Sequence, residues 1–345
     1  MVAKIAPQTP TAVDLFSGCG GLTQGLKQAG FNVLAAVEVA SRPADAYRRN
    51  HTETRLYQED VRQLSAERMM DDCGLVVGEL GLLAGCPPCQ GFSRLRTRNK
   101  SASVEDARND LVLDFFRLAI AMRPKTIMLE NVPALRLDAG FRAGVLRLEE
   151  EGYLVHVEVS DASHYSVPQR RRRLIMLASR VHAPYFVQPH DSIITVKDAI
   201  GRLEPPHGSD DPLHRIPENR SAAVKKIISL IPKDGGSRSD LPSHYQLECH
   251  KKSSGFSDVY GRMSWDRVSP TITSGCHNPS KGRFLHPDQD RAITLREAAI
   301  LQGFPRDYKF EVTHGKEAIA LMIGNALPPP FIAAHAAQLR EAISK

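Results

Sequence analysis

The stretch TAVDLFSGCGGL (residues 11–22) decides the fold. Its first six residues are mostly apolar and predict a buried strand, and Gly18, Gly20 and Gly21 predict a tight turn into a helix. Glycine accepts positive φ and has no side chain, so such a turn lets a ligand approach the backbone closely. A strand that enters a helix through glycines is typical of the first unit of a doubly wound α/β sheet.

The same alternation continues through the first half of the chain. Apolar runs predict further strands at 31–39, 56–59, 80–84, 126–130 and 174–178, and helical spacing predicts helices at 22–29 and 111–122. This order predicts a mostly parallel, doubly wound, Rossmann-like sheet with its sites at the carboxyl ends of the strands. After about residue 185, frequent Pro, Gly, Ser and His predict a smaller, irregular domain, with helices at 221–230, 292–302 and 328–344.

The composition narrows the class of protein. Of 345 residues, 45 are Lys or Arg and 39 are Asp or Glu, for a formal net charge of +6, and 42% are hydrophobic. This is globular composition, and no apolar run approaches the ~20 residues that span a bilayer, so we expect a soluble, cytoplasmic protein with no membrane contact. The basic excess permits a nucleic-acid partner without establishing one. Six cysteines are too few for a disulfide scaffold.

Two acids lie where a doubly wound sheet holds an adenosine-containing ligand. The glycine turn is followed by no P-loop lysine and lacks the full dinucleotide fingerprint, so it is a weak signal by itself. Glu38 ends the second expected strand, where an acid commonly binds ribose hydroxyls, and Asp60 follows the third and could accept from an adenine amino group. Each feature alone fits a structural turn or a solvated acid equally well, and together they favour the ligand.

The stretch AGCPPCQGFS (84–93) carries the most informative chemical signal. An apolar strand runs into two prolines, which fix the backbone, and Cys89 follows on a loop. This position suits a nucleophile, provided that the environment raises the thiolate fraction. A structural cysteine stays open as an alternative. A metal site is not expected, because zinc would need a second cysteine pair besides Cys86 and Cys89.

Glu130 closes another expected strand, whose carboxyl end can lie beside the loop that bears Cys89. Partial desolvation would raise the pKa of this carboxyl, so that it could donate a proton near neutral pH. A capping or solvated glutamate is the alternative.

Basic residues cluster at two places near these groups. In QRRRR (169–173), alternation along a strand would put Gln169, Arg171 and Arg173 on one face, and guanidiniums near a core need anionic or carbonyl partners. Arg94, Arg96, Arg98 and Lys100 make the loop after Cys89 basic, which suits phosphates as well as plain solvation.

Taken in order, these residues resemble the DNA (cytosine-5)-methyltransferase family. Seven segments match the family's motifs in the family's order: DLFSGCGGL (14–22), GCPPCQGFS (85–93), ENV (130–132), QRRRR (169–173), RVSPTITSG (267–275), LREAAILQGFP (295–305) and GNALPPP (324–330). No single motif decides the resemblance, but the ordered set covers nearly the whole chain and is very specific.

The resemblance implies S-adenosylmethionine as the cofactor and S-adenosylhomocysteine as its product. Phe16 would stack on the adenine, Glu38 would hold the ribose and Asp60 would hold the adenine amino group. The other expected cofactor contacts are Asp14, Gly18, Gly20, Gly21, Pro88, Leu111 and Asn325.

The resemblance also implies the chemistry on double-stranded DNA. Cys89 would attack C6 of a flipped-out cytosine, which makes C5 nucleophilic toward the methyl group. Glu130 would protonate or hydrogen-bond N3, and Asn131 would support the loop. Arg173, with Arg171, would contact the cytosine carbonyl oxygen. The expected DNA contacts are Gln90, Ser93, Arg94, Arg96, Arg98, Arg262, Arg267, Thr271 and Thr273.

The family's organisation divides the chain into three segments. A catalytic and cofactor-binding domain is expected at 1–188, a target-recognition domain at 189–305, and a C-terminal segment at 306–345 that returns to the first domain. The expected enzyme is a monomer that acts alone or beside a restriction endonuclease for the same site. Two positions depart from the family's pattern: Val39-Ala40-Ser41 follow Glu38 without the usual acid or Asn, and Gly81 replaces a common Asp.

Three other classes of protein were weighed against this one. A tRNA cytosine-5 methyltransferase usually carries a Cys-Phe-Thr tripeptide in its target region, and the sequence has none. An inactive DNA-binding regulator would not need Cys89, Glu130 and Arg173. A nicotinamide dehydrogenase leaves the Pro-Pro-Cys loop and the Gln-Arg run unexplained.

Overall fold

The computed structural model describes residues 9–88, 110–246 and 258–344. The chain forms two compact units. The sheet unit comprises Met1–Asp161, Arg172–Pro189 and Leu327–Lys345, and the second unit comprises Ala162–Arg171 and His190–Ala326.

The sheet unit is built on a seven-stranded sheet with the order β3-β2-β1-β4-β5-β7-β6. Its strands are β1 (Thr11–Leu15), β2 (Asn32–Val37), β3 (Arg55–Tyr57), β4 (Leu82–Gly85), β5 (Thr126–Asn131), β6 (Leu154–Asp161) and β7 (Arg172–Ser179). Only β7 runs against its neighbours. The sheet is therefore mostly parallel and doubly wound, as the sequence predicts.

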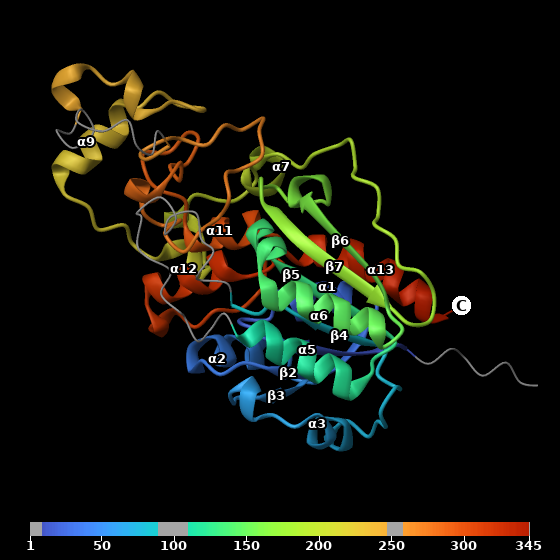
Figure 1. Ribbon diagram of the computed structural model, residues 1–345. Coiled ribbons are helices and arrows are strands. Elements are labelled where there is room, and N and C mark those ends of the chain that lie inside the picture. The colour runs from blue at the N-terminus through green and yellow to red at the C-terminus, as the bar shows by residue number, and fades with distance from the viewer. Residues whose placement is uncertain (1–8, 89–109, 247–257, 345) are drawn as a thin grey trace, which may run out of the picture. The chain divides into compact units, whose positions relative to one another are not determined.

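Helices cover both faces of this sheet (Figure 1). They are α1 (Gly21–Gln28), α2 (Ser41–Asn50), α3 (Ala66–Asp72), α5 (Leu111–Met122), α6 (Ala139–Glu150) and α13 (Pro329–Ser344), with short 3₁₀ turns η1 (Val61–Gln63) and η3 (Pro133–Leu137). Helices α1 and α13 pack together on one face, and α5 packs beside α6 on the other.

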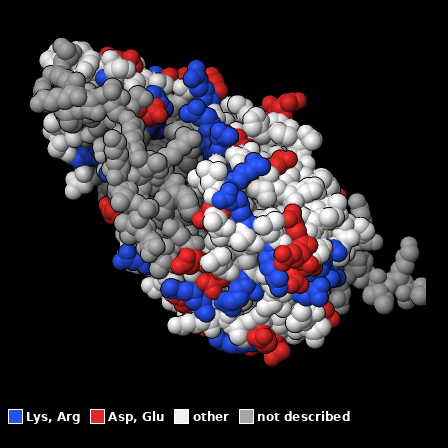
Figure 2. All heavy atoms as spheres, in the orientation of Figure 1, with Lys and Arg blue, Asp and Glu red and all other residues white. Residues whose placement is uncertain are grey.

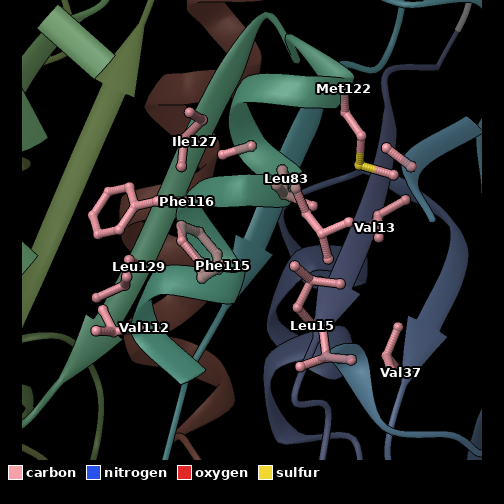
Figure 3. Packing of buried hydrophobic residues seen from close by; sticks show 14 of the residues in the cluster. Val13, Leu15, Val37, Leu83, Val112, Phe115, Phe116, Met122, Ile127 and Leu129 are labelled. Carbon is pink, nitrogen blue, oxygen red and sulfur yellow. The ribbon is translucent and has the colours of Figure 1, made fainter. Parts of the chain in front are cut away.

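The core between the sheet and α5 is built from the apolar residues that defined the pattern (Figure 3). Leu83 and Leu129 from neighbouring strands meet Phe115 of α5, and all three are fully buried. Burial of one such side chain contributes about 1.5–3 kcal/mol relative to exposure. The core therefore lies directly behind the carboxyl ends of β1, β4 and β5.

Those three strand ends are held in register at one edge of the sheet. Leu15 of β1 pairs with Gly85 of β4, which in turn pairs with Leu129 of β5. From β1 the chain adds β2 and β3 on one side of the sheet, and from β4 it adds the later strands on the other side. The position between β1 and β4 is therefore the switch point at which doubly wound sheets bind ligands. The glycine turn, the two prolines and Glu130 all follow at this edge.

The departure from the family's pattern at Gly81 has a steric reason. A Cβ atom at Gly81 would lie 2.7 Å from the carbonyl oxygen of Thr11, which is backbone and cannot move aside easily. The close approach of this segment to β1 therefore requires glycine.

The second unit is irregular, as predicted. Its helices are α7 (Val196–Ile200), α8 (Pro212–Arg215), α9 (Ala222–Leu230), α11 (Leu295–Leu301) and α12 (Lys316–Asn325). It also has 3₁₀ turns η4 (Ala162–His164), η5 (Pro206–Gly208), η6 (Arg238–Asp240), η7 (Ser243–Tyr245), η8 (Pro279–Lys281) and η9 (Val312–His314). In the part of it that the structure describes, β pairing is limited to isolated bridges such as Gln169 with Ser269.

The C-terminal return to the sheet begins at Leu327, later than the predicted residue 306. Phe304, Tyr308 and Phe310 stack on one another with ring centroids 4.5–5.7 Å apart, and α12 packs on α11. These contacts keep residues 306–326 in the second unit. Residues 162–171 also belong to it, which the sequence did not indicate.

Among the described residues, one stretch, Lys316–Ser344, is long and apolar enough to cross a membrane by composition alone. It contains α12 and α13, and 61% of its most apolar window is buried inside the protein. A helix that packs in a core needs the same composition, so burial accounts for its hydropathy.

Charged side chains of both signs are interspersed on the face of the protein shown in Figure 2. The ion pairs of the sheet unit include pairs within one helix, such as Arg49 with Asp45 and Arg147 with Glu150. Exposed pairs of this kind contribute little to stability. The modest net charge therefore says less about function than the position of individual arginines.

Candidate active site and cofactor turn

The turn after β1 holds three residues with left-handed backbone: Phe16 at φ 62°, Gly18 at φ 55° and Gly20 at φ 96°. Positive φ at a non-glycine residue is uncommon and marks functional sites more often than other places. A Cβ atom at Gly18 would meet nothing within 4 Å. The backbone at Gly18 therefore faces open space at the edge where the sheet favours a ligand.

Glu38 joins this turn to the end of β2. Its Oε2 accepts a hydrogen bond from the Gly18 N–H at 2.9 Å, and its Oε1 accepts one from the Ala40 N–H at 2.7 Å. Burial raises the pKa of this carboxyl, and the backbone hydrogen bonds oppose the rise. Because Ala40 contributes only its backbone, the departure from the family's pattern after Glu38 leaves this arrangement intact.

Asp60 follows β3 and binds its own neighbour. Its carboxylate accepts from the side chain of Arg62 at 2.6 Å and caps η1 through the Arg62 N–H at 3.0 Å. The hydrogen bonds from Arg62 lower the pKa of Asp60. A ligand's amino group at this acid would therefore compete with Arg62.

Asp14 lies beneath the turn, which argues against its predicted contact with the cofactor. Its side chain is fully buried, and Oδ2 accepts from the Thr23 hydroxyl at 2.6 Å. Burial raises the pKa of this carboxyl to about 8, so it carries a proton at neutral pH. Asp14 therefore supports α1 from the core and presents no atom to a surface ligand.

The other predicted cofactor residues divide between the two units. Pro88 and Leu111 are half-buried in the sheet unit. Pro88 lies in the segment after β4, Leu111 begins α5 and Gly21 begins α1. Asn325 ends α12 in the second unit. Their contacts with a cofactor stay predictions.

Glu130 is the buried acid of the strand edge, with 1% of its surface exposed. Its Oε1 lies 3.0 Å from Nε of Arg173, the second residue of β7. Its Oε2 accepts a hydrogen bond from the thiol of Cys86 at 3.1 Å. One carboxylate oxygen is thus paired with an arginine of β7, and the other is hydrogen-bonded to the cysteine that follows β4.

Asn131 binds the proline segment before Cys89, and its role toward the catalytic loop stays a prediction. Its Nδ2 donates to the carbonyl oxygen of Pro87 at 2.9 Å, and its Oδ1 accepts from the Val132 N–H at 2.8 Å. The segment Cys86–Pro88 is therefore tied to β5 directly before Cys89. Several predicted residues of the loop lie outside the described residues: Cys89, Gln90, Ser93, Arg94, Arg96 and Arg98.

Two other cysteines are poor candidates for a nucleophile. Cys19 and Cys276 are buried, and burial raises the pKa of each thiol to about 12. At neutral pH the thiolate fraction of either residue is negligible.

Arg171 has a structural role, in contrast to its predicted contact with cytosine. The strand β7 begins at Arg172, so the alternation expected for 169–173 does not extend across this point. Arg171 is 3% exposed and donates at 3.2 Å to the carbonyl oxygens of Ile272, Gly324 and Ala326. Its guanidinium links the segment at Ile272 to the segment 324–326, both in the second unit.

The predicted contact of Arg262 with DNA is also not supported, because this side chain is fully buried. Its guanidinium donates to the carbonyl oxygens of Ile228, Ile231, His286 and Gln289 and to the carboxylate of Asp290, at 2.5–3.1 Å. These contacts assign Arg262 to the core of the second unit and argue against the predicted contact with DNA.

The remaining predicted DNA contacts are at the surface of the second unit. Arg267 and Thr273 are exposed, and Thr271 is half-buried with its hydroxyl donating to the Arg170 carbonyl oxygen at 2.6 Å. Their roles toward DNA stay predictions.

Two sets of contacts near the site are absent from the sequence-based prediction. From the sequence, Cys86 was considered only as a possible metal ligand, although its thiol contacts Glu130. Tyr47 of α2 and His51, which caps the C-terminus of that helix, lie behind the glycine turn. The helical spacing of these two residues in an otherwise polar segment is the signal that could have found them.

The sheet order, the glycine turn after β1 and the buried acid at the end of β5 define an enzyme with the Rossmann-like methyltransferase fold. A family model described as C-5 cytosine-specific DNA methylase matches residues 11–341, and the chain belongs to this family. It is a DNA (cytosine-5)-methyltransferase by enzyme class, as the ordered motifs predict.

Relatives and solved structures of similar length support this assignment. The chain is 36% identical over 331 residues to the Type II methylase M.HgiDII of Herpetosiphon aurantiacus, covering 92% of this chain and 91% of that protein. It is 32% identical over 326 residues to the Type II methyltransferase M1.HphI of Haemophilus parahaemolyticus, with 92% and 83% covered. A prophage-encoded methyltransferase structure from E. coli has a TM-score of 0.69 and 26% identity, with 98% and 100% covered.

Proposed function

We propose that this enzyme transfers a methyl group from S-adenosylmethionine to C5 of a flipped-out cytosine in a specific sequence of double-stranded DNA. The observation that carries the proposal is the placement of Glu130. This acid is buried between Cys86 and Arg173, and the strand that bears it holds the Pro87 carbonyl just before Cys89. The arrangement supplies an acid, a cation and a fixed backbone segment directly before Cys89, the proposed nucleophile.

The turn after β1 fits the cofactor. Gly18 leaves open space beside the backbone, Phe16 has the strained backbone typical of ligand sites, and Glu38 brings a carboxylate to the same turn. Phe16 would stack on the adenine and Glu38 would hold the ribose, whereas Asp60 would reach the adenine amino group in competition with Arg62. When bound, S-adenosylmethionine supplies an electrophilic methyl group.

Three residues have separate roles in the reaction on the cytosine base. The Cys89 thiolate forms a bond to C6 while the electrons of the C5–C6 double bond shift toward N3 and the carbonyl oxygen. Glu130 donates a proton or a hydrogen bond at N3, and Arg173 stabilises charge at the oxygen. C5 then takes up the methyl group. Loss of the C5 proton and elimination of the Cys89 thiolate restore the ring and free the enzyme.

The substrate must leave the duplex for this chemistry. C5 and C6 of cytosine are covered by stacking, so the base is flipped out at a cost of a few kcal/mol. Arg267 and Thr273 are exposed in the second unit and are proposed to contact DNA there. Which bases they read depends on docking geometry.

We further propose a cytoplasmic, monomeric enzyme that works beside a cognate restriction endonuclease or alone. The Type II names of its relatives favour the former setting.

Bisulfite sequencing of DNA from a host that expresses the protein tests the proposal. We expect one short sequence context to be protected at cytosine, and no protection in a host that expresses Glu130→Gln. Uniform conversion with the wild-type protein, together with methylation of tRNA by the purified enzyme, would contradict the DNA substrate.

A further inference from the structure

Helix α2 and the residue that caps its C-terminus place two buried aromatic side chains behind the cofactor turn. Tyr47 is fully buried and His51 is 1% exposed. His51 is the C-cap residue of this helix, four positions after Tyr47, and the two ring centroids are 4.7 Å apart. Neither residue contributes to the chemistry proposed above.

His51 binds the backbone of the turn itself. Its Nδ1 lies 2.8 Å from Nζ of Lys27, and its Nε2 lies 3.2 Å from the carbonyl oxygen of Gly20. An ammonium group only donates, so Nδ1 is the acceptor and the ring proton is on Nε2. The imidazole therefore donates to Gly20, and Lys27 fixes the tautomer that allows it.

Tyr47 secures the other side of the turn. Its hydroxyl lies 2.8 Å from that of Thr23, and the Thr23 hydroxyl donates to Asp14. Tyr47, Thr23 and Asp14 are therefore joined in one line of hydrogen bonds. One chain of hydrogen bonds thus joins α2 to α1 and β1, on either side of the glycines.

The turn lacks a side-chain cap at the start of α1. Gly20 is the N-cap residue of α1 but has no side chain to cap the helix, and its φ is 96°. Glycine also loses more conformational freedom on folding than any other residue. Burial and the charge of Lys27 lower the pKa of His51 to about 4, so the neutral donor form is present at physiological pH.

We propose that His51 is a positioning residue for the cofactor turn, which holds the Gly20 carbonyl and so sets the affinity for S-adenosylmethionine without touching it. This inference rests on the proposed function, because it assumes that the Gly18–Gly20 turn binds the cofactor. The physical reason is preorganisation: a turn already in its bound conformation loses less entropy when the ligand arrives.

The test measures binding of S-adenosylhomocysteine by calorimetry, without DNA, to the full chain. His51→Ala removes the donor, His51→Gln keeps an N–H at the ε position, and the exposed His182→Ala is the matched control. We expect His51→Ala to raise the Kd about 10-fold, the glutamine variant to restore most of the affinity, and His182→Ala to match the wild type. In turnover assays, KM for the cofactor should rise with Kd while kcat changes less than about 3-fold.

A purely structural role would lower the melting temperature without this split between KM and kcat. A folded His51→Ala protein with wild-type Kd overturns the proposal. If His51→Ala does not fold, Lys27→Met decides: we expect about a 3-fold weaker Kd, and an unchanged Kd overturns the proposal. Failure of the wild-type protein itself to bind S-adenosylhomocysteine would instead contradict the proposed function.

Discussion

Nε of Arg173 lies 3.0 Å from Oε1 of Glu130, and this ion pair joins the start of β7 to the end of β5. The Glu130 side chain is 2% exposed and that of Arg173 is 17% exposed, so the pair is shielded from water on the acid's side. A buried carboxylate persists only with such partners. The antiparallel strand β7 is what brings an arginine to the edge where the parallel strands end.

Glu130→Gln keeps the shape of the acid and removes its charge and its acidic proton. We expect single-turnover methyl transfer to fall by at least about 100-fold, because an amide is a poor proton donor at N3. Binding of DNA and S-adenosylhomocysteine should stay within about 3-fold, and Glu158→Gln, at an exposed position of β6, should leave the rate unchanged. A near-wild-type single-turnover rate for Glu130→Gln would remove this residue from the mechanism.

Arg173→Lys keeps the positive charge but loses the planar guanidinium. Because an ammonium cannot reproduce the Nε contact with Glu130, we expect the rate of methyl transfer to fall about 10- to 100-fold in a folded protein. Arg171→Lys should behave differently, since its contacts are to three backbone carbonyls and its loss should appear as a lower melting temperature. Parallel melting curves and rate measurements separate the two outcomes, and a normal rate for Arg173→Lys would contradict the role of Arg173.

Arg262→Met removes a buried guanidinium that donates to four carbonyl oxygens and to the carboxylate of Asp290. We expect the free energy of unfolding to fall by about 3–5 kcal/mol, measured by urea denaturation. The exposed Arg267→Met should stay within about 0.5 kcal/mol of the wild type. An Arg262→Met protein of unchanged stability that binds DNA more weakly would restore the direct contact that the sequence predicted.

His335 of α13 makes the stability of the sheet unit depend on pH. It packs edge-on against the rings of Phe331 and Phe186, and burial lowers its pKa from 6.5 to about 4. Between pH 6.5 and pH 4, His335 is protonated in the unfolded chain but neutral in the folded protein. The free energy of unfolding therefore falls as the pH drops from 6.5 toward 4, by roughly 3 kcal/mol in total.

His335→Leu should remove this dependence. We expect its melting temperature, relative to the wild type, to rise as the pH is lowered from 7 to 5, whereas the exposed His182→Leu should show no such trend. Parallel pH profiles of wild type and His335→Leu would show that the ring does not titrate on unfolding.

Sequence patterns predicted the elements whose apolar spacing is strong. Helix α5 begins and ends at the predicted residues, 111 and 122, because one face packs into the core. Helix α2 was missed because its sequence, SRPADAYRRN, is mostly polar and buries only Ala44, Ala46 and Tyr47. Strand β6 was missed because it is an edge strand whose residues are exposed or half-buried and none fully buried.

The roles of individual arginines could not be predicted from local sequence. Arg171 contacts carbonyls 101, 153 and 155 residues away, and Arg262 contacts carbonyls 24–34 residues away. Whether a guanidinium is buried depends on these distant partners, and motif spacing carries no information about them. The place of Glu130 and Asn131 at a strand end was predictable from the apolar run before them, whereas their contacts with Cys86, Pro87 and Arg173 were not.

The most direct test of the account is covalent trapping of the base by Cys89. After bisulfite sequencing has identified the site, a duplex with 5-fluorocytosine at the target position is incubated with enzyme and S-adenosylmethionine and run on a denaturing gel. Fluorine at C5 cannot leave as a proton does, so we expect a stable protein–DNA adduct with the wild-type enzyme and none with Cys89→Ala. An adduct that persists with Cys89→Ala would contradict the central claim.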